Sequence, residues 1–220
     1  MTTSGIGLRE LKKQMTRESI ADAALKLTLE KGLEHVTIDE IAQLAFISPR
    51  TVSNYFSCKE EAVVAAGIQD SFTIIEDLAE RPLDEPPLES LSELLAEFAR
   101  SRTTEQLRLS AQKVALSAQH PSLRPFQTAQ YDQLEAALRD TIAGRTGTDV
   151  QHDLYPWLVA AAAVSAVRAA MQLWVESGAE PQALPELIQR SLTQISNGLP
   201  APQTRPRRMR AVDNPAEAAS

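Results

Sequence analysis

The chain has 220 residues, of which 43% are hydrophobic, and a formal net charge of -7. This length allows one ordinary core, or a small module joined to a larger one. The acidic balance excludes a protein that covers nucleic acid or an anionic membrane with its whole surface, so any such contact must be local.

Cysteine and histidine usage argues against metal and redox chemistry. Cys58 is the single cysteine, so the chain cannot form an internal disulfide. The three histidines, His35, His120 and His152, share no metal-ligand spacing. We therefore expect no metal, no cofactor and no catalytic residue. The first residues lack the apolar core of a signal peptide, which together with the free thiol predicts a cytoplasmic protein.

Two helices are predicted at the start of the chain. The first spans residues 16–33, where apolar residues recur at helical spacing and Gly32 suits a C-terminal cap. Thr37 and Glu40 then stand in capping-box register, which marks the start of a second, short helix.

A third and a fourth helix follow from the next capping signals. Ser48 suits the N-cap of a short helix with Pro49 at its first position, where the missing amide hydrogen has no partner to lose. Ser57 and Glu60 repeat the capping-box pattern. They predict a long fourth helix, residues 59–81, that ends before a proline.

The remaining chain continues the helical pattern. The proline-rich stretch 82–87 suggests a joint between modules. Five further helices are predicted, at 88–100, 104–119, 123–143, 154–175 and 184–195. No strand-like alternation of any length is present, so we predict an all-α fold of about nine helices. Residues 199–220 carry prolines and arginines but few large apolar groups and are predicted to be a disordered tail.

The stretch from Leu154 to Val175 is long enough to cross a bilayer. Arg168 near its centre argues against insertion, because a central arginine costs roughly 2.5–3.5 kcal/mol and alanine offers little hydrophobic compensation. We expect a buried helix of a soluble protein and no membrane partner.

The third helix carries an unusual group of polar side chains. On a helical wheel, Arg50, Ser53 and Asn54 share one side, while Val52 and Phe56 lie on the opposite side. An apolar anchor therefore holds a short, capped helix whose outer face presents an arginine and an asparagine. This is what a helix that reads the DNA major groove requires.

The polar face predicts specific base contacts. Arg50 suits paired hydrogen bonds to guanine O6 and N7, and Asn54 suits adenine N6 and N7. Pro49 and Ser53 complete the predicted base-contacting set. Without further context, a solvated face of an exposed helix is the more ordinary interpretation of Arg50 and Asn54.

Other residues near this helix suit phosphate. Thr37 and Lys59 lie at helix starts, where amide groups and positive charge favour anions, and Thr51 and Tyr55 place hydroxyls beside the reading face. The distribution of charge along the sequence also favours a local contact with DNA near the N-terminus. Residues 1–17 hold four basic side chains against one acidic, whereas residues 61–200 hold ten basic against nineteen acidic.

The segment "IADAALKLTLEKGLEHVTIDEIAQLAFISPRTVSNYFSCKEEAV" resembles the N-terminal helix-turn-helix of TetR-type repressors. The matching residues are Ala23, Ala24, Gly32, Thr37, Ile41, Ala42, Ser48, Thr51, Tyr55, Phe56 and Lys59. Taken together they are specific, although each alone is weak. The pattern around 48–63 further resembles an actinobacterial subgroup that includes mycofactocin-type regulators.

The resemblance implies an organisation and a function. It implies a DNA-binding helix-turn-helix domain at 1–58 and a helical domain at 59–198 that binds an effector and dimerises through its last two helices. The expected partners are double-stranded operator DNA with a palindromic sequence, a second copy of the chain, and a small, hydrophobic effector that releases the repressor.

Three residues depart from the family pattern. Phe46 stands where the family usually has a turn glycine, so it is either strained by a positive φ or packed. Ser53 replaces a usual aromatic, so a contact made by that ring cannot be carried over. Thr28 replaces a common phenylalanine in the first helix, which affects the packing of the head.

Six residues of the body are candidates for lining an effector cavity, because a few polar groups among aromatics suit a hydrophobic ligand. They are Phe98, Gln112, Phe126, Tyr131, Trp157 and Trp174. Each is also a reasonable core residue. The alanine-rich stretch 160–170 suits either a dimer seam or simple close packing.

Two alternatives belong to other functional classes. A helical protein-interaction module would not bind DNA at all. A helical enzyme would need a converging acid, base or nucleophile, and no spacing in the sequence supplies one. The basic run 205–210 suits a solvated tail better than a DNA-binding arm.

Overall fold

The computed structural model describes residues 7–201, and every regular element in this range is helical. The α-helices are α1 (Leu8–Lys31), α2 (Ile38–Leu44), α3 (Pro49–Tyr55), α4 (Lys59–Ala65), α5 (Ile68–Glu80), α6 (Pro87–Ser101), α7 (Thr104–Gln119), α8 (Arg124–Thr146), α9 (Leu154–Ser177) and α10 (Leu184–Ser196). Short 3-10 turns η1 (Leu33–His35), η2 (Pro121–Leu123) and η3 (Pro181–Ala183) lie between them. The predicted all-α class is confirmed. Most of the predicted tail, with the basic run 205–210, lies outside the described residues.

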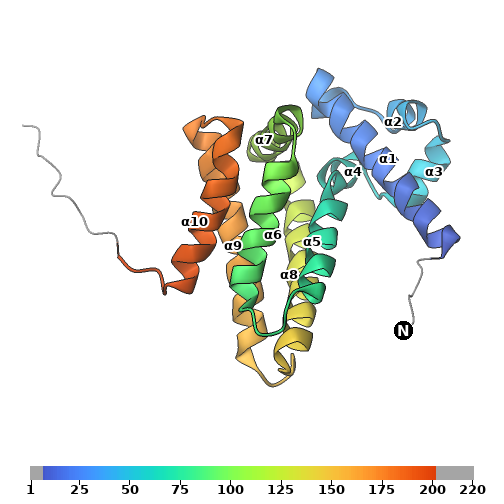
Figure 1. The fold of residues 1–220 in the computed structure, drawn as a ribbon. Coiled ribbons are helices and arrows are strands. Elements are labelled where there is room, and N and C mark those ends of the chain that lie inside the picture. Colours follow the sequence, from blue (N-terminus) through green and yellow to red (C-terminus); the bar gives the residue numbers. More distant parts are fainter. Residues whose placement is uncertain (1–6, 202–220) are drawn as a thin grey trace, which may run out of the picture.

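The helices form two groups (Figure 1). Helices α1 to α4 make a head at one end, and α5 to α10 make an elongated body, with α10 at its far edge. Helix α4 packs against α1. The head therefore extends to Ala66, beyond the boundary at residue 58 that the sequence predicted.

The predicted long helix at 59–81 is wrong, because the chain breaks between α4 and α5. Ala66 has an extended backbone (φ -58°, ψ 128°), and Gly67 adopts the left-handed conformation with φ 74°. Glycine enters this region without steric cost. The break accounts for the tenth helix in the described range.

Two other local predictions are corrected. The capping box of Ser57 and Glu60 does not form. Cys58 is the N-cap of α4, and the Ser57 backbone N–H and Oγ donate instead to Glu61 Oε2, at 2.8 and 2.7 Å. The first helix begins at Leu8 and not near residue 16, and its extra turns carry an exposed Lys13–Glu10 pair at 3.3 Å.

Two hydrophobic clusters organise the molecule. One belongs to the body, and the other lies in the head around Ile20, Ile41 and Val52. The head cluster also includes Leu116 from α7 and Leu123 from η2. The body thus inserts side chains into the core of the head, and the two parts share buried apolar surface.

Helix α9 is the one helix within residues 7–201 that is long and apolar enough to span a membrane. Its inner face packs into the body core through alanines and Trp174, and it lies against α8 and α10. Its outer face leaves Leu154, Leu158 and Leu173 exposed. The prediction of a helix within a helical bundle fits this packing.

Arg145 of α8 clamps the far end of the body. Its guanidinium donates to the carbonyls of Leu78 and Arg81 at 2.7 Å, of Pro82 at 2.8 Å and of Glu85 at 3.1 Å. These carbonyls belong to the end of α5 and to the loop before α6, where helical partners are missing. One buried cation therefore joins the end of α5 to the following loop, where the Leu78 and Pro82 carbonyls also accept the backbone N–H groups of Arg81 and Glu85.

We expect Arg145→Met to lower the free energy of unfolding by roughly 3 kcal/mol, because it removes four hydrogen bonds of a buried cation and takes from the Arg81 and Glu85 carbonyls the donor found for them within residues 7–201. Urea denaturation followed by circular dichroism measures this change. Arg100→Met, which removes an exposed arginine of α6, is the matched control and should change little. Equal effects of the two substitutions would contradict the clamp.

Candidate nucleic-acid interface and interior cavity

Capping side chains fix both helices of the helix-turn-helix. At α2, Thr37 Oγ1 accepts from the Glu40 N–H at 3.3 Å, and the Glu40 carboxylate accepts from the Thr37 N–H at 3.0 Å. At α3, Ser48 Oγ accepts from the Thr51 N–H at 3.1 Å, and Pro49 occupies the first turn. Both predicted N-caps are confirmed, and they set where the reading helix begins.

The turn between α2 and α3 is closed by Phe46 in the left-handed conformation, with φ 56°. The Ile47 N–H donates to the Ala42 carbonyl at 2.9 Å, and the Phe46 N–H to the Gln43 carbonyl at 3.2 Å. The Phe46 side chain is 94% exposed. The sequence left two alternatives for Phe46, a packed side chain or a strained backbone. The backbone is strained, and the prediction of a packed side chain is wrong.

The outer face of α3 is open. Pro49, Arg50, Ser53 and Asn54 are all exposed, while Val52 on the opposite side is fully buried. Ser53 Oγ donates to the Pro49 carbonyl at 3.2 Å, so this hydroxyl is turned back on its own helix. Within the described part of the chain, Arg50 and Asn54 make no side-chain hydrogen bond or ion pair, so both are available to an external partner.

The predicted phosphate-contacting residues differ in how accessible they are. Thr37 is exposed, whereas Thr51 and Tyr55 are half-buried. Thr51 Oγ1 shares a hydrogen bond with Ser48 Oγ at 2.8 Å. Contacts of these three residues with phosphate stay predictions.

Lys59 is largely occupied by the protein itself. Its ammonium donates to the carbonyls of Leu33 at 2.7 Å, Val36 at 3.0 Å and Glu34 at 3.4 Å. It ties the start of α4 to the η1 turn. The contact of Lys59 with phosphate stays a prediction. Because its N–H groups already donate to carbonyls, Lys59 would attract a phosphate mainly through its positive charge.

Arg17 of α1 positions the reading helix, a role that the sequence analysis missed. Its Nη1 donates to the Tyr55 carbonyl at 2.8 Å, and its guanidinium stacks on the Phe56 ring at 4.2 Å. An ion pair with Glu61 at 3.6 Å completes its contacts. The sequence shows Arg17 only as one of four basic residues near the N-terminus, because its partners lie about forty residues away.

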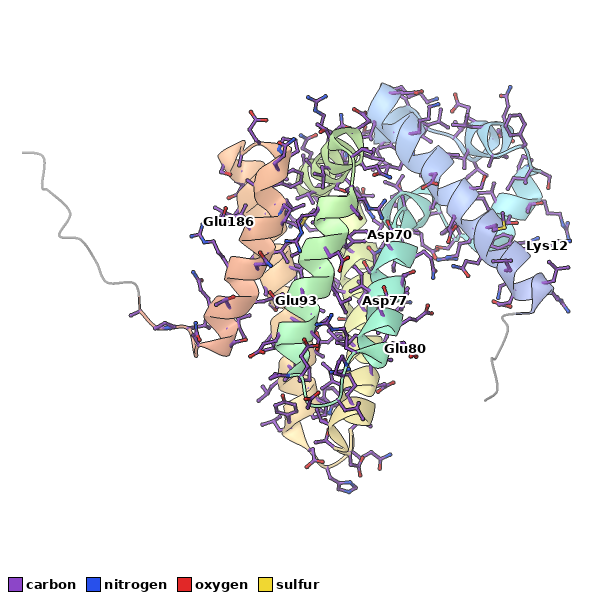
Figure 2. All side chains as sticks on the ribbon, viewed as in Figure 1. Lys12, Asp70, Asp77, Glu80, Glu93 and Glu186 are labelled. Carbon is purple, nitrogen blue, oxygen red and sulfur yellow. The ribbon has the colours of Figure 1, made fainter. Side chains whose placement is uncertain are left out.

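The head is nearly neutral, with eight basic and nine acidic side chains within residues 7–66, whereas the body is acidic. Figure 2 shows Lys12 near the N-terminal end of α1, on the side of the head away from the body. The labelled acidic residues Asp70, Asp77, Glu80, Glu93 and Glu186 all lie on body helices. Local basic charge beside α3 is the arrangement that a contact with DNA requires.

A cavity of about 1040 Å³ that is partly open to solvent lies between the helices of the body, walled by α5 to α10. Its lining is mainly apolar, and Glu18, Asp22 and Leu25 of α1 also reach it. The cavity thus extends from the body to the first helix of the head. Of the six candidates from the sequence, Phe98 and Tyr131 line this cavity.

The other four candidates lie elsewhere. Gln112 is exposed on α7, and Phe126 packs against the head core. Trp157 is exposed, with Arg139 stacked on its ring at 4.0 Å. Trp174 is buried in the body core and donates to the Glu180 carbonyl at 3.2 Å. None of them is among the residues that line the cavity.

Four cations contribute to the cavity wall, namely Arg102, Lys113, Arg124 and Arg168. Arg102 pairs with Asp70 at 2.5 Å, and Arg168 stacks over the Tyr131 ring at 4.5 Å. Lys113 donates to the Ala66 carbonyl. Burial lowers the pKa of Lys113 to about 8, against the opposing influence of Asp22 and Asp70. Lys113 therefore carries its charge at neutral pH in a site that disfavours it.

Comparisons with known proteins agree with this architecture. Residues 20–66 match the model of bacterial regulatory proteins of the tetR family, and residues 85–200 match that of the MftR C-terminal domain. The second match covers more than half of the chain. The chain belongs to the TetR family of transcriptional regulators. Because this is a family of regulators and not of enzymes, the enzyme alternative falls away.

Individual relatives support the same assignment. The chain is 30% identical over 180 residues to the HTH-type transcriptional regulator TcmR of Streptomyces glaucescens, covering 79% of each chain. A TetR regulator from Rhodococcus sp. RHA1 has a similar fold, with a TM-score of 0.55 and 18% identity, covering 87% of this chain and all of the other. Thermus thermophilus FadR, solved with lauroyl-CoA, has a TM-score of 0.53 and 21% identity, covering 86% and 97%.

We expect Phe46→Gly to raise the free energy of unfolding of this TetR-family protein by about 1 kcal/mol, because glycine adopts a positive φ without strain. Urea denaturation measures it. Phe46→Ala keeps a Cβ in the same conformation and should give no such gain. A gain of equal size for alanine would show that removal of the exposed ring, and not relief of the backbone, is responsible.

Proposed function

We propose that this TetR-family protein is a cytoplasmic homodimeric repressor that binds a palindromic operator and is released by a small hydrophobic effector. The observation that carries the proposal is the free outer face of α3, held by Ser48 at its start and by Arg17 at its end. Rigid presentation of a short helix is what direct readout of the major groove requires.

Arg50 and Asn54 are the proposed readers of bases. Both are exposed and free of intramolecular partners within residues 7–201. Arg50 would pair with guanine and Asn54 with adenine. Pro49 and Ser53 flank them on the same face, and Thr37, Thr51, Tyr55 and Lys59 are proposed to face the phosphates.

We expect Arg50→Ala and Asn54→Ala each to weaken binding to operator DNA by about tenfold to a hundredfold, the loss of one bidentate base contact. An electrophoretic mobility-shift assay on the DNA upstream of its own gene measures the affinity. Arg100→Ala, on the body, is the control and should bind like the wild type. Unchanged binding by both head variants would rule out these base contacts. A wild-type protein that ignores DNA sequence and salt concentration would instead favour the protein-interaction module.

The outer face of α9 is the proposed dimer seam. Leu154, Leu158 and Leu173 are 68%, 58% and 55% exposed, and the small side chains of Ser165 and Ala169 lie between them along the helix. Large apolar side chains aligned on one face indicate an interaction surface. The alanines of α9 have two roles. Ala169 lies on the exposed face, whereas Ala160, Ala163, Ala166 and Ala170 are buried in the body core.

We expect the double variant Leu158→Glu/Leu173→Glu to be monomeric, because four like charges would meet across a two-fold seam. Size-exclusion chromatography with light scattering measures the mass. Leu83→Glu, at an exposed leucine in the loop after α5, should remain dimeric. A dimeric double variant would place the seam elsewhere.

The cavity is the proposed effector site. Its size and apolar lining, with Phe98 and Tyr131 in the wall, suit a hydrophobic molecule. Two structures of similar fold hold such ligands: FadR contains lauroyl-CoA, and SmeT, with a TM-score of 0.54 and 20% identity, contains triclosan. Operator release would follow from a shift between two conformations of the head relative to the body.

A further inference from the structure

Lys113 links the cavity to the head. It lies on α7, lines the cavity, and its ammonium donates to the carbonyl of Ala66, the C-cap residue of α4. A carbonyl at a helix C-terminus has no helical partner and carries partial negative charge, so a cation stabilises it. The single contact joins the ligand space to the last residue before the break at Gly67.

The ammonium keeps donor capacity beyond this contact. It has three N–H groups, and within residues 7–201 the Ala66 carbonyl is the one acceptor found for it. Asp22 and Asp70 lie near enough to raise the pKa of Lys113, but neither forms an ion pair with it. Asp70 is already paired with Arg102.

The position is costly for a structural residue. Burial of a charged group costs free energy unless the group is paired. One backbone carbonyl and two carboxylates that form no ion pair with Lys113 compensate only part of this cost. A methionine would fill the same volume without that penalty. A state of the protein in which a bound anion pairs with the Lys113 ammonium would offset this cost.

We propose that Lys113 binds an acidic group of the effector and, by leaving the Ala66 carbonyl, transmits occupancy of the cavity to the head. This rests on the proposed function as an effector-responsive repressor. The effector is then an apolar molecule with a carboxylate or a phosphate at the end nearest α1 and α4. Loss of the cation frees the α4 terminus to move about Gly67, and α4 carries the head with it through its packing on α1.

Calorimetric titration without DNA tests the binding step. The probes are dodecanoate, dodecyl phosphate and 1-dodecanol, which share one alkyl chain and differ in the head group. We expect wild-type protein to bind at least one of the two acids tenfold or more tightly than the alcohol, and the better acid identifies the head group. Failure to prefer either acid, or to bind any of the probes, would overturn the proposal.

Two variants separate charge from packing. Lys113→Met should bind the alcohol like the wild type but lose the preference for the acid, and Lys113→Arg should retain it. Arg108→Met removes an exposed cation from the same helix, outside the cavity, and should behave like the wild type. An acid preference that survives in Lys113→Met would overturn the proposal.

A measurement on unmodified protein covers the case in which a variant fails to fold. The acid preference at pH 7 should fall as pH rises toward 10, because Lys113, with a pKa of about 8, loses its proton in this range. The other charged groups on this side of the cavity are Glu18, Asp22, Asp70 and Arg102. A preference that is constant over this range would overturn the proposal.

Operator release tests the coupling step and distinguishes the two proposals. The preferred acid should release wild-type protein from its upstream DNA, while Lys113→Met should stay bound at the same acid concentration. Release of Lys113→Met at the wild-type concentration would overturn the coupling. If wild-type protein binds no DNA selectively, the proposed repressor function fails, while the calorimetric result on Lys113 still stands or falls on its own.

Discussion

The head has no hydrophobic core of its own that is separate from the body. Leu116 and Leu123 lie in the same buried cluster as Ile20 and Val52, although they come from α7 and η2. Phe126 packs on this cluster as well, and His120 contacts Glu34 at 3.1 Å across the same junction. Since interiors are close-packed, a change in the position of α7 is felt in the head. The orientation of α3, and with it any reading of DNA, depends on this shared packing.

Four basic side chains of this protein bind backbone carbonyls at the ends of helices and turns. Arg17, Lys59, Lys113 and Arg145 each donate to backbone carbonyls at element ends. Carbonyls at the end of a helix lack the full set of helical partners. A count of lysines and arginines therefore overstates the charge that is free to meet phosphate, and Arg50 differs from them by having no partner among the described residues.

The sequence predicted the local features of the fold well and the long-range ones poorly. The caps at Thr37 and Ser48 depend on residues three positions apart, so the pattern alone reveals them. The break at Gly67 was missed because a lone glycine is tolerated within a helical pattern, and a contact from Lys113, 47 residues away, supports the bend. The cavity was only partly predicted for a similar reason. Whether Phe98 or Trp174 faces the ligand space depends on how each helix is rotated in the bundle, which periodicity does not determine.

Helix α5 is held very differently at its two ends. Its last turn and the following loop are fixed by the four carbonyl contacts of Arg145, whereas its first residue follows a single glycine with φ 74°. A helix that is anchored at its far end and connected to the head through one glycine allows the head to turn about that glycine. Small displacements of the cavity wall would then be converted into swinging of the DNA-reading end while the distal half of the bundle keeps its shape.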